Sequence, residues 1–378
     1  MQRLCRGCGQ ELPEKPLLQF RNMPKAAQFL PDASEIEQEK GVDLRVLQCL
    51  HCGLVQVDCD PVPYFREVVR ASGFSKEMRD FRLKQFADWV DRCSLRGRKV
   101  LEIGCGHGEY LELMHAQGVI AHGLEYGEEA VSECYRKGLQ VVRGSIVDGN
   151  TYLPSSPFHA FLILSYLEHL PDPGAALRKI CANLEEDAVG LVEVPNFDLI
   201  LEKGLFSEFI PDHLHYFTRE TLSGLLQRNG FDVLGCEEVW HRYILSASVR
   251  KRKNLDLAWL DRRQTELTLS LQDYVQRFGK GNIAIWGAGH QALAVIALSG
   301  IAPYIRYVVD SAPFKQGRFT PATHIPIVSP ESLETSPVRA ILVMAASYSD
   351  EVATILMHTF GSRMHAAILR DFGLEVIA

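Results

Sequence analysis

The sequence predicts an α/β protein in three parts: a small cysteine-rich lobe, a central Rossmann-like domain and a smaller C-terminal α/β domain. Two Cys-x-x-Cys pairs lie within the first 52 residues, and two apolar strands run directly into glycine turns, Gly104–Gly108 and Gly287–Gly289. We expect these boundaries: 1–62 for the lobe, 63–249 for the central domain, and 250–378 for a linker helix with the last domain.

The composition is that of ordinary globular domains. The chain has 378 residues, 47% of them hydrophobic and 23% charged, which excludes a largely disordered protein. Its 40 Lys+Arg against 47 Asp+Glu give a net charge of −7, so nucleic acid is not an expected partner. The N-terminus lacks the apolar run of a signal peptide, and no apolar stretch reaches the ~18 residues of a membrane span. We expect a soluble cytoplasmic protein that binds no membrane.

Four of the ten cysteines form a candidate metal site. In a reducing compartment, paired Cys-x-x-Cys turns indicate a metal rather than disulfides. Four thiolates fill the tetrahedron that zinc prefers and leave no open position, so the zinc should be structural. Four unliganded cysteines, or a redox-active pair, are the alternatives. The predicted ligands are Cys5, Cys8, Cys49 and Cys52.

The central part reads as strands and helices in alternation. A buried strand over 98–104 meets a glycine-rich turn, and a helix over 109–117 follows. Such a turn lets a ligand approach the backbone and presents helix N–H groups to it. Dinucleotide binders and S-adenosylmethionine binders share this G-x-G-x-G pattern. An ordinary α/β domain whose glycines only shape turns is the plain alternative.

The later strands of this part end in polar residues. The second ends at Glu125, whose carboxylate suits the two hydroxyls of a ribose, and the third ends near Ser145, where an adenine could lie. The fourth is followed by Glu168 and His169. Because parallel strands present their carboxyl ends at one edge of the sheet, these residues should share one crevice.

Two further histidines follow the fifth strand, in the segment EFIPDHLHYF over 208–217. Histidine has the unperturbed pKa best suited to proton transfer at neutral pH. His213 and His169 are therefore candidate catalysts, with Asp212 as a residue that orients or stabilises them. A metal site formed by these histidines and the aspartate is a weaker alternative. For His215 and Tyr216 we expect a structural role, capping the helix that begins near Thr218.

The C-terminal part repeats the strand–turn–helix pattern after a long helix predicted over 250–281. Its turn supplies N–H groups, and two nearby basic residues suit a diphosphate. A packing domain with basic surface residues is the alternative. The candidate substrate-binding residues are Gly287, Gly289, Lys315 and Arg318.

The central motifs resemble class I S-adenosylmethionine-dependent methyltransferases. The motif E-x-G-C-G-x-G, the acidic end of the second strand and L-E-H-L-x-D-P stand at matching intervals. This resemblance implies S-adenosylmethionine as the cofactor. The cofactor contacts it implies are Glu102, Gly104, Gly106, Glu125 and Ser145.

Nearly the whole chain is similar to one family, the zinc-containing sugar C-methyltransferases, which act on nucleotide-linked 4-keto-deoxy sugars. The similarity is carried by CRGC with CLHC, LEIGCGHG, LEHLPDP, VEVPNF, DHLHYFT, WGAGHQA and VVDSAPFKQGRFTPATHIPI. It implies that a histidine base removes the proton beside a ketone, so that an enolate carbon accepts the methyl group. In the family this base belongs to a Tyr-x-Glu-His segment, which here falls on His213, and His169 lies across the substrate.

The sequence departs from this family at the candidate site. Ile210 stands at the tyrosine position and Asp212 at the glutamate. The segment after the lobe lacks the family's tyrosine-rich stretch and offers Arg70 and Ser72 instead. These differences leave O- or N-methylation of another small metabolite as the main alternative. A ligand-sensing binding protein and a zinc-ribbon nucleic-acid binder are weaker alternatives.

Overall fold

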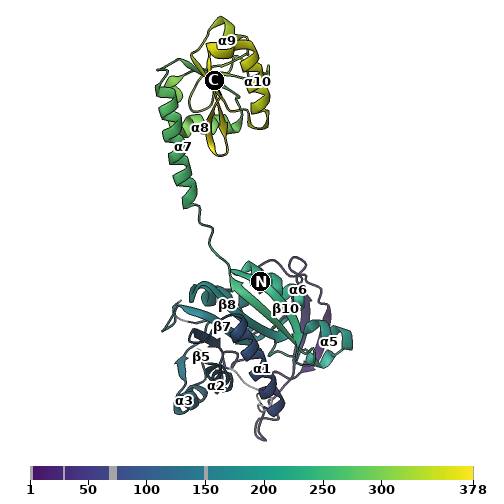
Figure 1. Ribbon diagram of the computed structural model, residues 1–378. Helices are drawn as coiled ribbons and strands as arrows, with labels where there is room; N and C mark the ends of the chain where they lie inside the picture. The colour runs from purple at the N-terminus through teal and green to yellow at the C-terminus, as the bar shows by residue number, and fades with distance from the viewer. Residues whose placement is uncertain (1–2, 29, 68–74, 149–151, 378) are drawn as a thin grey trace. The chain divides into compact units, whose positions relative to one another are not determined.

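A computed structural model gives the fold of the chain and describes residues 3–28, 30–67, 75–148 and 152–377. The chain forms two compact units, Met1–Asn254 and Leu255–Ala378 (Figure 1). Arg70 and Ser72 lie outside the described residues. Within those residues, no helix is both long enough and apolar enough to cross a bilayer.

The first unit contains a seven-stranded sheet that confirms the predicted Rossmann-like fold. Its strands are β4 (Lys99–Ile103), β5 (Ile120–Glu125), β6 (Gln140–Arg143), β7 (Phe158–Leu164), β8 (Leu184–Pro195), β10 (Phe231–Val239) and β11 (Ile244–Lys251). The order is β10-β11-β8-β7-β4-β5-β6, with β4 to β8 parallel and β10 and β11 antiparallel. The chain order reverses between β4 and β7, where open α/β sheets bind their ligands.

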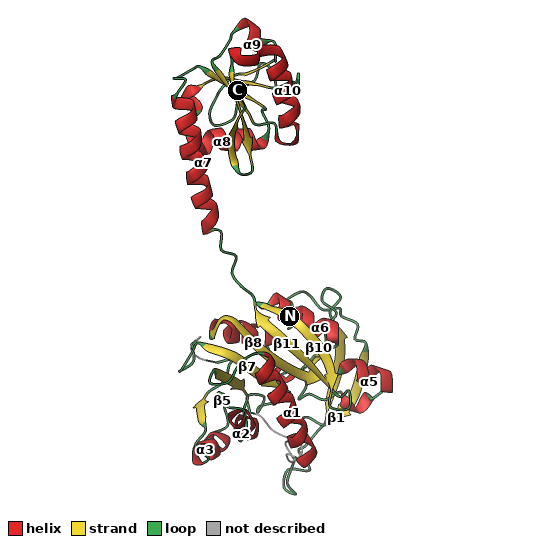
Figure 2. Ribbon diagram, in the orientation of Figure 1, coloured by secondary structure: helices red, strands yellow, loops and turns green. Residues whose placement is uncertain are grey.

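Helices cover both faces of this sheet (Figure 2). They are α1 (Lys76–Arg92), α2 (Glu109–Ala116) and α3 (Glu128–Arg136) on one face, and α4 (Pro173–Ala182) and α6 (Arg219–Arg228) on the other. Side chains of β4 alternate between the faces, since Val100 packs with the α1 side and Leu101 with the α4 side. Asp172 and Thr218 accept backbone hydrogen bonds at the starts of α4 and α6, which fixes where these helices begin.

The cysteine-rich lobe packs onto this domain through a second sheet. Its strands are β1 (Leu18–Met23), β2 (Val42–Gln48), β3 (Val55–Val57) and β9 (His215–Tyr216), in that order and all antiparallel. Val55 pairs with Tyr216 and Gln56 with His215. The lobe therefore contributes three strands to a sheet whose fourth strand directly follows the predicted histidine site.

The second unit is a smaller parallel α/β fold. Its strands are β12 (Ile283–Trp286), β13 (Ile305–Val309), β14 (Ile327–Val328), β15 (Ala340–Val343), β16 (His365–Arg370) and β17 (Gly373–Val376), and its main helices are α7 (Ala258–Gln276), α8 (His290–Ser299) and α10 (Ser349–Phe360). The order is β14-β13-β12-β15-β16-β17, parallel except for β17.

The long helix of this unit is shorter than the sequence predicted. The predicted start near residue 250 was wrong, because Arg250 and Lys251 continue β11 and pair with Asp232 and Phe231. The helix α7 begins at Ala258 and ends at Gln276. Its buried side chains Leu271 and Val275 pack into the core of the second unit.

Candidate functional site

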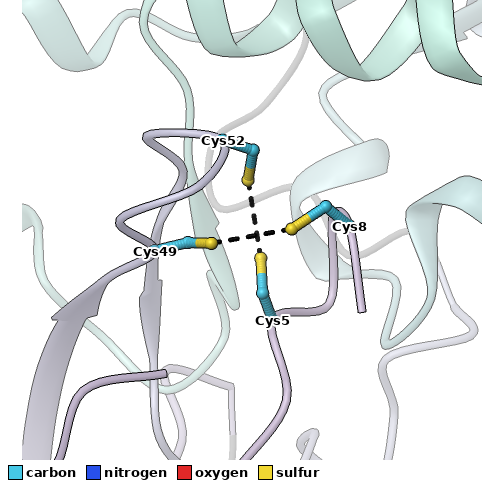
Figure 3. A group of neighbouring side chains, drawn as sticks. All are labelled: Cys5, Cys8, Cys49 and Cys52. Atoms are coloured by element: carbon cyan, nitrogen blue, oxygen red, sulfur yellow. Dashed lines mark hydrogen bonds between the residues drawn. The ribbon is translucent and has the colours of Figure 1, made fainter. Parts of the chain in front are cut away.

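Four cysteine sulfurs converge in the lobe (Figure 3). The Sγ atoms of Cys5 and Cys52 lie 3.6 Å apart, as do those of Cys8 and Cys49, and all four lie within 4.8 Å of one another. A tetrahedral zinc with sulfur at about 2.3 Å requires sulfurs roughly 3.8 Å apart, so the four positions fit this ion.

The backbone around the cysteines is built for the same geometry. Gly9 and Gly53 follow the two pairs with φ of +75° and +76°, a region that favours glycine. A Cβ on Gly7 would lie 2.7 Å from a methyl group of Leu54, so a larger residue in the first turn would require that side chain to shift. Burial raises the pKa of Cys52 to about 11, and a bound cation is what would hold such a thiol as thiolate.

The glycine turn after β4 is tied to the end of β5. Glu125 is buried, and its two carboxylate oxygens accept hydrogen bonds from the N–H groups of Gly106 at 2.8 Å and Gly127 at 2.9 Å. Gly104 and Gly106 have φ of +71° and +54°. Each carboxylate oxygen keeps further acceptor capacity, so Glu125 can fix the turn and still receive ribose hydroxyls.

Glu102 and Ser145 also lie where the sequence placed them. Glu102 belongs to β4 and is 1% exposed, and Ser145 follows β6 and is 9% exposed. With the turn and Glu125, these residues stand at the carboxyl ends of the adjacent strands β4, β5 and β6. The set fits a nucleoside-type cofactor, with a carboxylate for hydroxyl groups and glycines where the backbone must be approached.

The structure brings the two predicted catalytic histidines together. The rings of His169 and His213 lie edge to face with their centroids 4.9 Å apart. His169 belongs to the short turn Leu167–His169 after β7, and its Nδ1 lies 2.8 Å from the carbonyl oxygen of Asp212. A carbonyl accepts only from a protonated nitrogen, so this bond places the His169 proton on Nδ1 and leaves Nε2 as an acceptor.

Burial keeps this pair neutral. It lowers the pKa of His213 to about 3, with a further contribution from His169, and burial also lowers the pKa of His169. Glu168 lies beside them with its Oε1 3.9 Å from His169 Nε2, and burial raises its pKa to about 8. Near neutral pH, the site therefore presents two unprotonated imidazoles and a protonated carboxyl group.

Asp212 is held by the cysteine-rich lobe and by the segment that follows it, a feature that the sequence did not reveal. The phenol of Tyr64 donates to Asp212 Oδ1 at 2.5 Å, and the backbone N–H of Ala27 donates to Oδ2 at 2.9 Å. The segment after the lobe thus offers one phenol to the site region, although the family's tyrosine-rich stretch is absent. The sequence held one clue to this contact, since Tyr64 is a single tyrosine shortly after the second cysteine pair.

His215 and Tyr216 are structural, but not as helix caps. His215 Nε2 lies 2.8 Å from the carbonyl oxygen of Leu170, and the Tyr216 hydroxyl accepts from the N–H of Ile210 at 2.9 Å. The predicted capping role was wrong, because Thr218 caps α6 with its own side chain. Both residues instead fix the loop that carries His213.

The turn of the second unit repeats the arrangement around Glu125. Asp310 follows β13, and its Oδ2 accepts from the N–H of Ala288 at 2.8 Å and from Lys315 Nζ at 2.8 Å. Gly287 has a φ of +115°, and a Cβ there would lie 2.5 Å from the carbonyl oxygen of Met344. Gly289 immediately precedes α8, and Arg318 is exposed on the loop after β13. The sequence analysis noted Asp310 only as a strand end.

Three family models match consecutive parts of the chain. A putative zinc binding domain matches residues 5–63, a methyltransferase domain 78–235 and a C-methyltransferase C-terminal domain 260–365. The C-methyltransferase NovU of Streptomyces niveus is 24% identical over 392 aligned residues, which cover 92% of this chain and 90% of that protein. The chain belongs to the C-methyltransferases with a zinc-binding domain. It is an S-adenosylmethionine-dependent methyltransferase with a four-cysteine zinc site, as its motifs predicted.

Other relatives and solved structures match a smaller share of the chain. A ubiquinone biosynthesis O-methyltransferase of Pseudomonas putida (strain GB-1) is 35% identical over 97 residues, which cover 24% of this chain and 42% of that relative. The chain thus matches less than half of that relative's length. A solved S-adenosylmethionine-dependent methyltransferase from Clostridium acetobutylicum ATCC 824 aligns with a TM-score of 0.40 and 12% identity, covering 48% of this chain and 96% of the other.

Proposed function

We propose that this C-methyltransferase methylates a carbon of a nucleotide-linked keto-deoxy sugar, through an enolate formed by a histidine base. The observation that carries the proposal is the half-buried, neutral pair of His169 and His213, whose rings contact each other edge to face. The turn bearing His169 follows β7, the neighbour of β4, whose carboxyl end carries the glycine turn. A base must be unprotonated to accept a proton, and these imidazoles meet that condition at neutral pH.

We assign roles to the remaining candidate residues on the same basis. Bound S-adenosylmethionine supplies an electrophilic methyl group, and the residues that would hold it are Glu102, Gly104, Gly106, Glu125 and Ser145. His213 takes the proton from the carbon beside the ketone, while His169 and Asp212 orient it and stabilise the charge that develops. In the second unit, Gly287, Gly289, Lys315 and Arg318 would bind the diphosphate of the substrate.

The proposal also assigns one role to each part of the chain. Residues 1–62 hold zinc, residues 63–249 bind the methyl donor, and residues 250–378 bind the nucleotide of the substrate. Cys-x-x-Cys pairs that converge on one metal site are typical of reducing compartments, which supports a cytoplasmic location. The matched C-methyltransferase models favour carbon over oxygen or nitrogen as the methylated atom.

Hydrogen exchange tests the histidine base directly. A thymidine diphosphate-linked 4-keto-deoxyhexose is incubated with enzyme in D2O without methyl donor, and loss of the α-proton signal is followed by NMR. We expect His213→Ala to slow exchange by at least about a hundredfold, and the exposed control His115→Ala to leave it unchanged. Exchange of wild-type rate in His213→Ala would remove this residue from the role of base. A product methyl group on a heteroatom would exclude the enolate route.

A further inference from the structure

Glu168 has a buried carboxyl group beside the two histidines. Its side chain is 1% exposed, and its Oε2 has no hydrogen-bond partner among the described residues. An unpaired polar atom in this position costs stability, so a group of this kind calls for a functional reason. The neighbouring histidines suggest such a reason. One carboxylate oxygen of Glu168 and one ring nitrogen each of His169 and His213 all lie within 4.8 Å of one another.

The backbone holds these three groups in one place. The carbonyl oxygen of Glu168 accepts from the N–H of Leu214 at 2.9 Å, which joins the turn after β7 to the residue following His213. His169 is bound to the carbonyl oxygen of Asp212 on the same loop. These bonds hold the turn that carries Glu168 and His169 against the loop that carries His213.

His213 as it stands is a weak base. Burial lowers its pKa to about 3, so removal of a carbon-bound proton would leave an unstabilised cation in a poorly solvated site. A carboxylate a few ångströms away attracts that cation strongly in such surroundings. Glu168 is the acidic group placed to supply this negative charge.

We propose that Glu168 acts through the two imidazoles, and that as a carboxylate it stabilises the imidazolium formed when His213 takes the substrate's proton. The inference rests on the proposed function. In this step the carbon–hydrogen bond breaks, its electron pair passes into the enolate, and the proton binds His213; nothing is oxidised or reduced. Glu168 has released its own proton to solvent beforehand and is a positioning residue, since it reaches the substrate only through the rings.

Titratable groups on the segments that neighbour the turn of Glu168 include Tyr166, His169, Asp212, His213, His215 and Glu193. Of the acidic ones, Asp212 also favours the charged form of His169. Asp212 is engaged by Tyr64 and Ala27, and Glu193 is paired with Arg82 at 2.5 Å. Burial alone raises the pKa of Glu168 to about 8, so its ionisation falls within an accessible pH range.

The first test reads the coupling without any substrate. Long-range 1H–15N NMR spectra of the histidine rings are recorded from pH 6 to 10, and the signals are assigned from His169→Asn and His213→Asn. We expect both rings to shift with an inflection near pH 8 in the wild type and in Glu185→Gln. That control removes a carboxylate from another Glu–His pair, in which Glu185 lies 3.2 Å from His159. Glu168→Gln should abolish the inflection, and its persistence would overturn the proposal.

The second test uses the same exchange reaction as the proposed function. Wild-type α-proton exchange should accelerate as the pH rises through about 8, whereas Glu168→Gln should lack this rise and exchange about 30-fold more slowly at pH 9. Glu168→Asp, which keeps an ionisable group, should restore the pH-dependent rise in part. A merely structural role predicts a lower rate with an unchanged pH profile, and that result would overturn the proposal.

The outcomes separate the two proposals. If His213→Ala loses exchange but Glu168→Gln keeps the wild-type profile, the histidine base stands and Glu168 has no such role. If His213→Ala exchanges normally, both proposals fail. Metal analysis completes the set, because a second metal ion per chain that disappears in Glu168→Gln would assign the cluster to metal binding instead. If Glu168→Gln does not fold, the NMR titration is carried out on Glu168→Asp instead. We then expect a smaller inflection than in the wild type, and an inflection of the same size would contradict the proposal.

Discussion

Tyr64 donates a 2.5 Å hydrogen bond to Asp212, although 148 residues separate them in the sequence. The same aspartate receives the N–H of Ala27, and its carbonyl oxygen accepts from the ring of His169. A chain of hydrogen bonds thus runs from the zinc-binding lobe to a histidine of the candidate active site. The lobe therefore helps to position the histidines and is more than an attached metal module.

Tyr64→Phe should impair catalysis while leaving the cofactor site intact. Loss of a hydrogen bond to a carboxyl group costs about 1.5–3 kcal/mol, so we expect α-proton exchange to slow roughly tenfold or more. The affinity for S-adenosylmethionine, measured by calorimetry, should not change. Tyr152→Phe is the control, because its side chain is 72% exposed. Equal exchange rates in the two variants would show that Tyr64 does not position the site.

Glu125→Ala should weaken binding of the methyl donor. The variant loses the contacts to Gly106 and Gly127 that hold the glycine turn, and it also loses the proposed acceptor for the ribose hydroxyls. We expect the Kd for S-adenosylmethionine to rise at least about tenfold in isothermal titration calorimetry. Glu129→Ala removes an exposed carboxylate of α3 and should bind as the wild type does. An unaltered Kd in Glu125→Ala would remove this residue from the cofactor site.

Cys49→Ser should destabilise the first unit and abolish zinc binding. Cys49 is fully buried and belongs to the same apolar cluster as Leu222 and Leu225 of α6. Because the metal links the lobe to that core, we expect the Tm to fall by about 10 °C or more. Cys93→Ser, which changes a cysteine outside the site, should keep about one zinc per chain. A wild-type protein that is folded but holds no zinc would contradict the assignment.

Local patterns explain what the sequence could predict. The Cys-x-x-Cys spacing places two sulfurs on one turn, and the short apolar run before Gly104 is typical of a buried strand, so both features are encoded within a few residues. Glu125 was found by the same reasoning, because it ends the next strand. In each case the chemistry depends on neighbours in sequence.

The remaining features depend on long-range packing. The pairing of β3 with β9 and the bond between Tyr64 and Asp212 join segments far apart in the chain. The state of Glu168 follows from burial by several elements together, which no local pattern reports. The start of α7 was misplaced for a related reason, since pairing with β10 holds Arg250 in a strand.

Acid should destabilise the first unit, in part through His213. The pKa of His213 is about 3 in the folded protein and about 6.5 in an unfolded chain, so between these values the unfolded state binds more protons. Stability therefore falls as the pH is lowered from about 6.5 toward 3. His213→Asn cannot bind this proton and should lose about 2 kcal/mol less than the wild type between pH 7 and 4.5 in urea denaturation.

The comparison isolates His213 because the other buried groups are common to both proteins. His215 has a pKa lowered to about 3 by burial, and Glu168 acts with the opposite sign above about pH 4.5, since its folded pKa is raised. Both residues are present in wild type and variant, so the difference between the two proteins at each pH mainly reports His213. His115→Asn, a change at an exposed position, should retain the full acid sensitivity. If His213→Asn were equally acid-sensitive, the native imidazole would already accept solvent protons in this range, and its burial as a neutral base would be refuted.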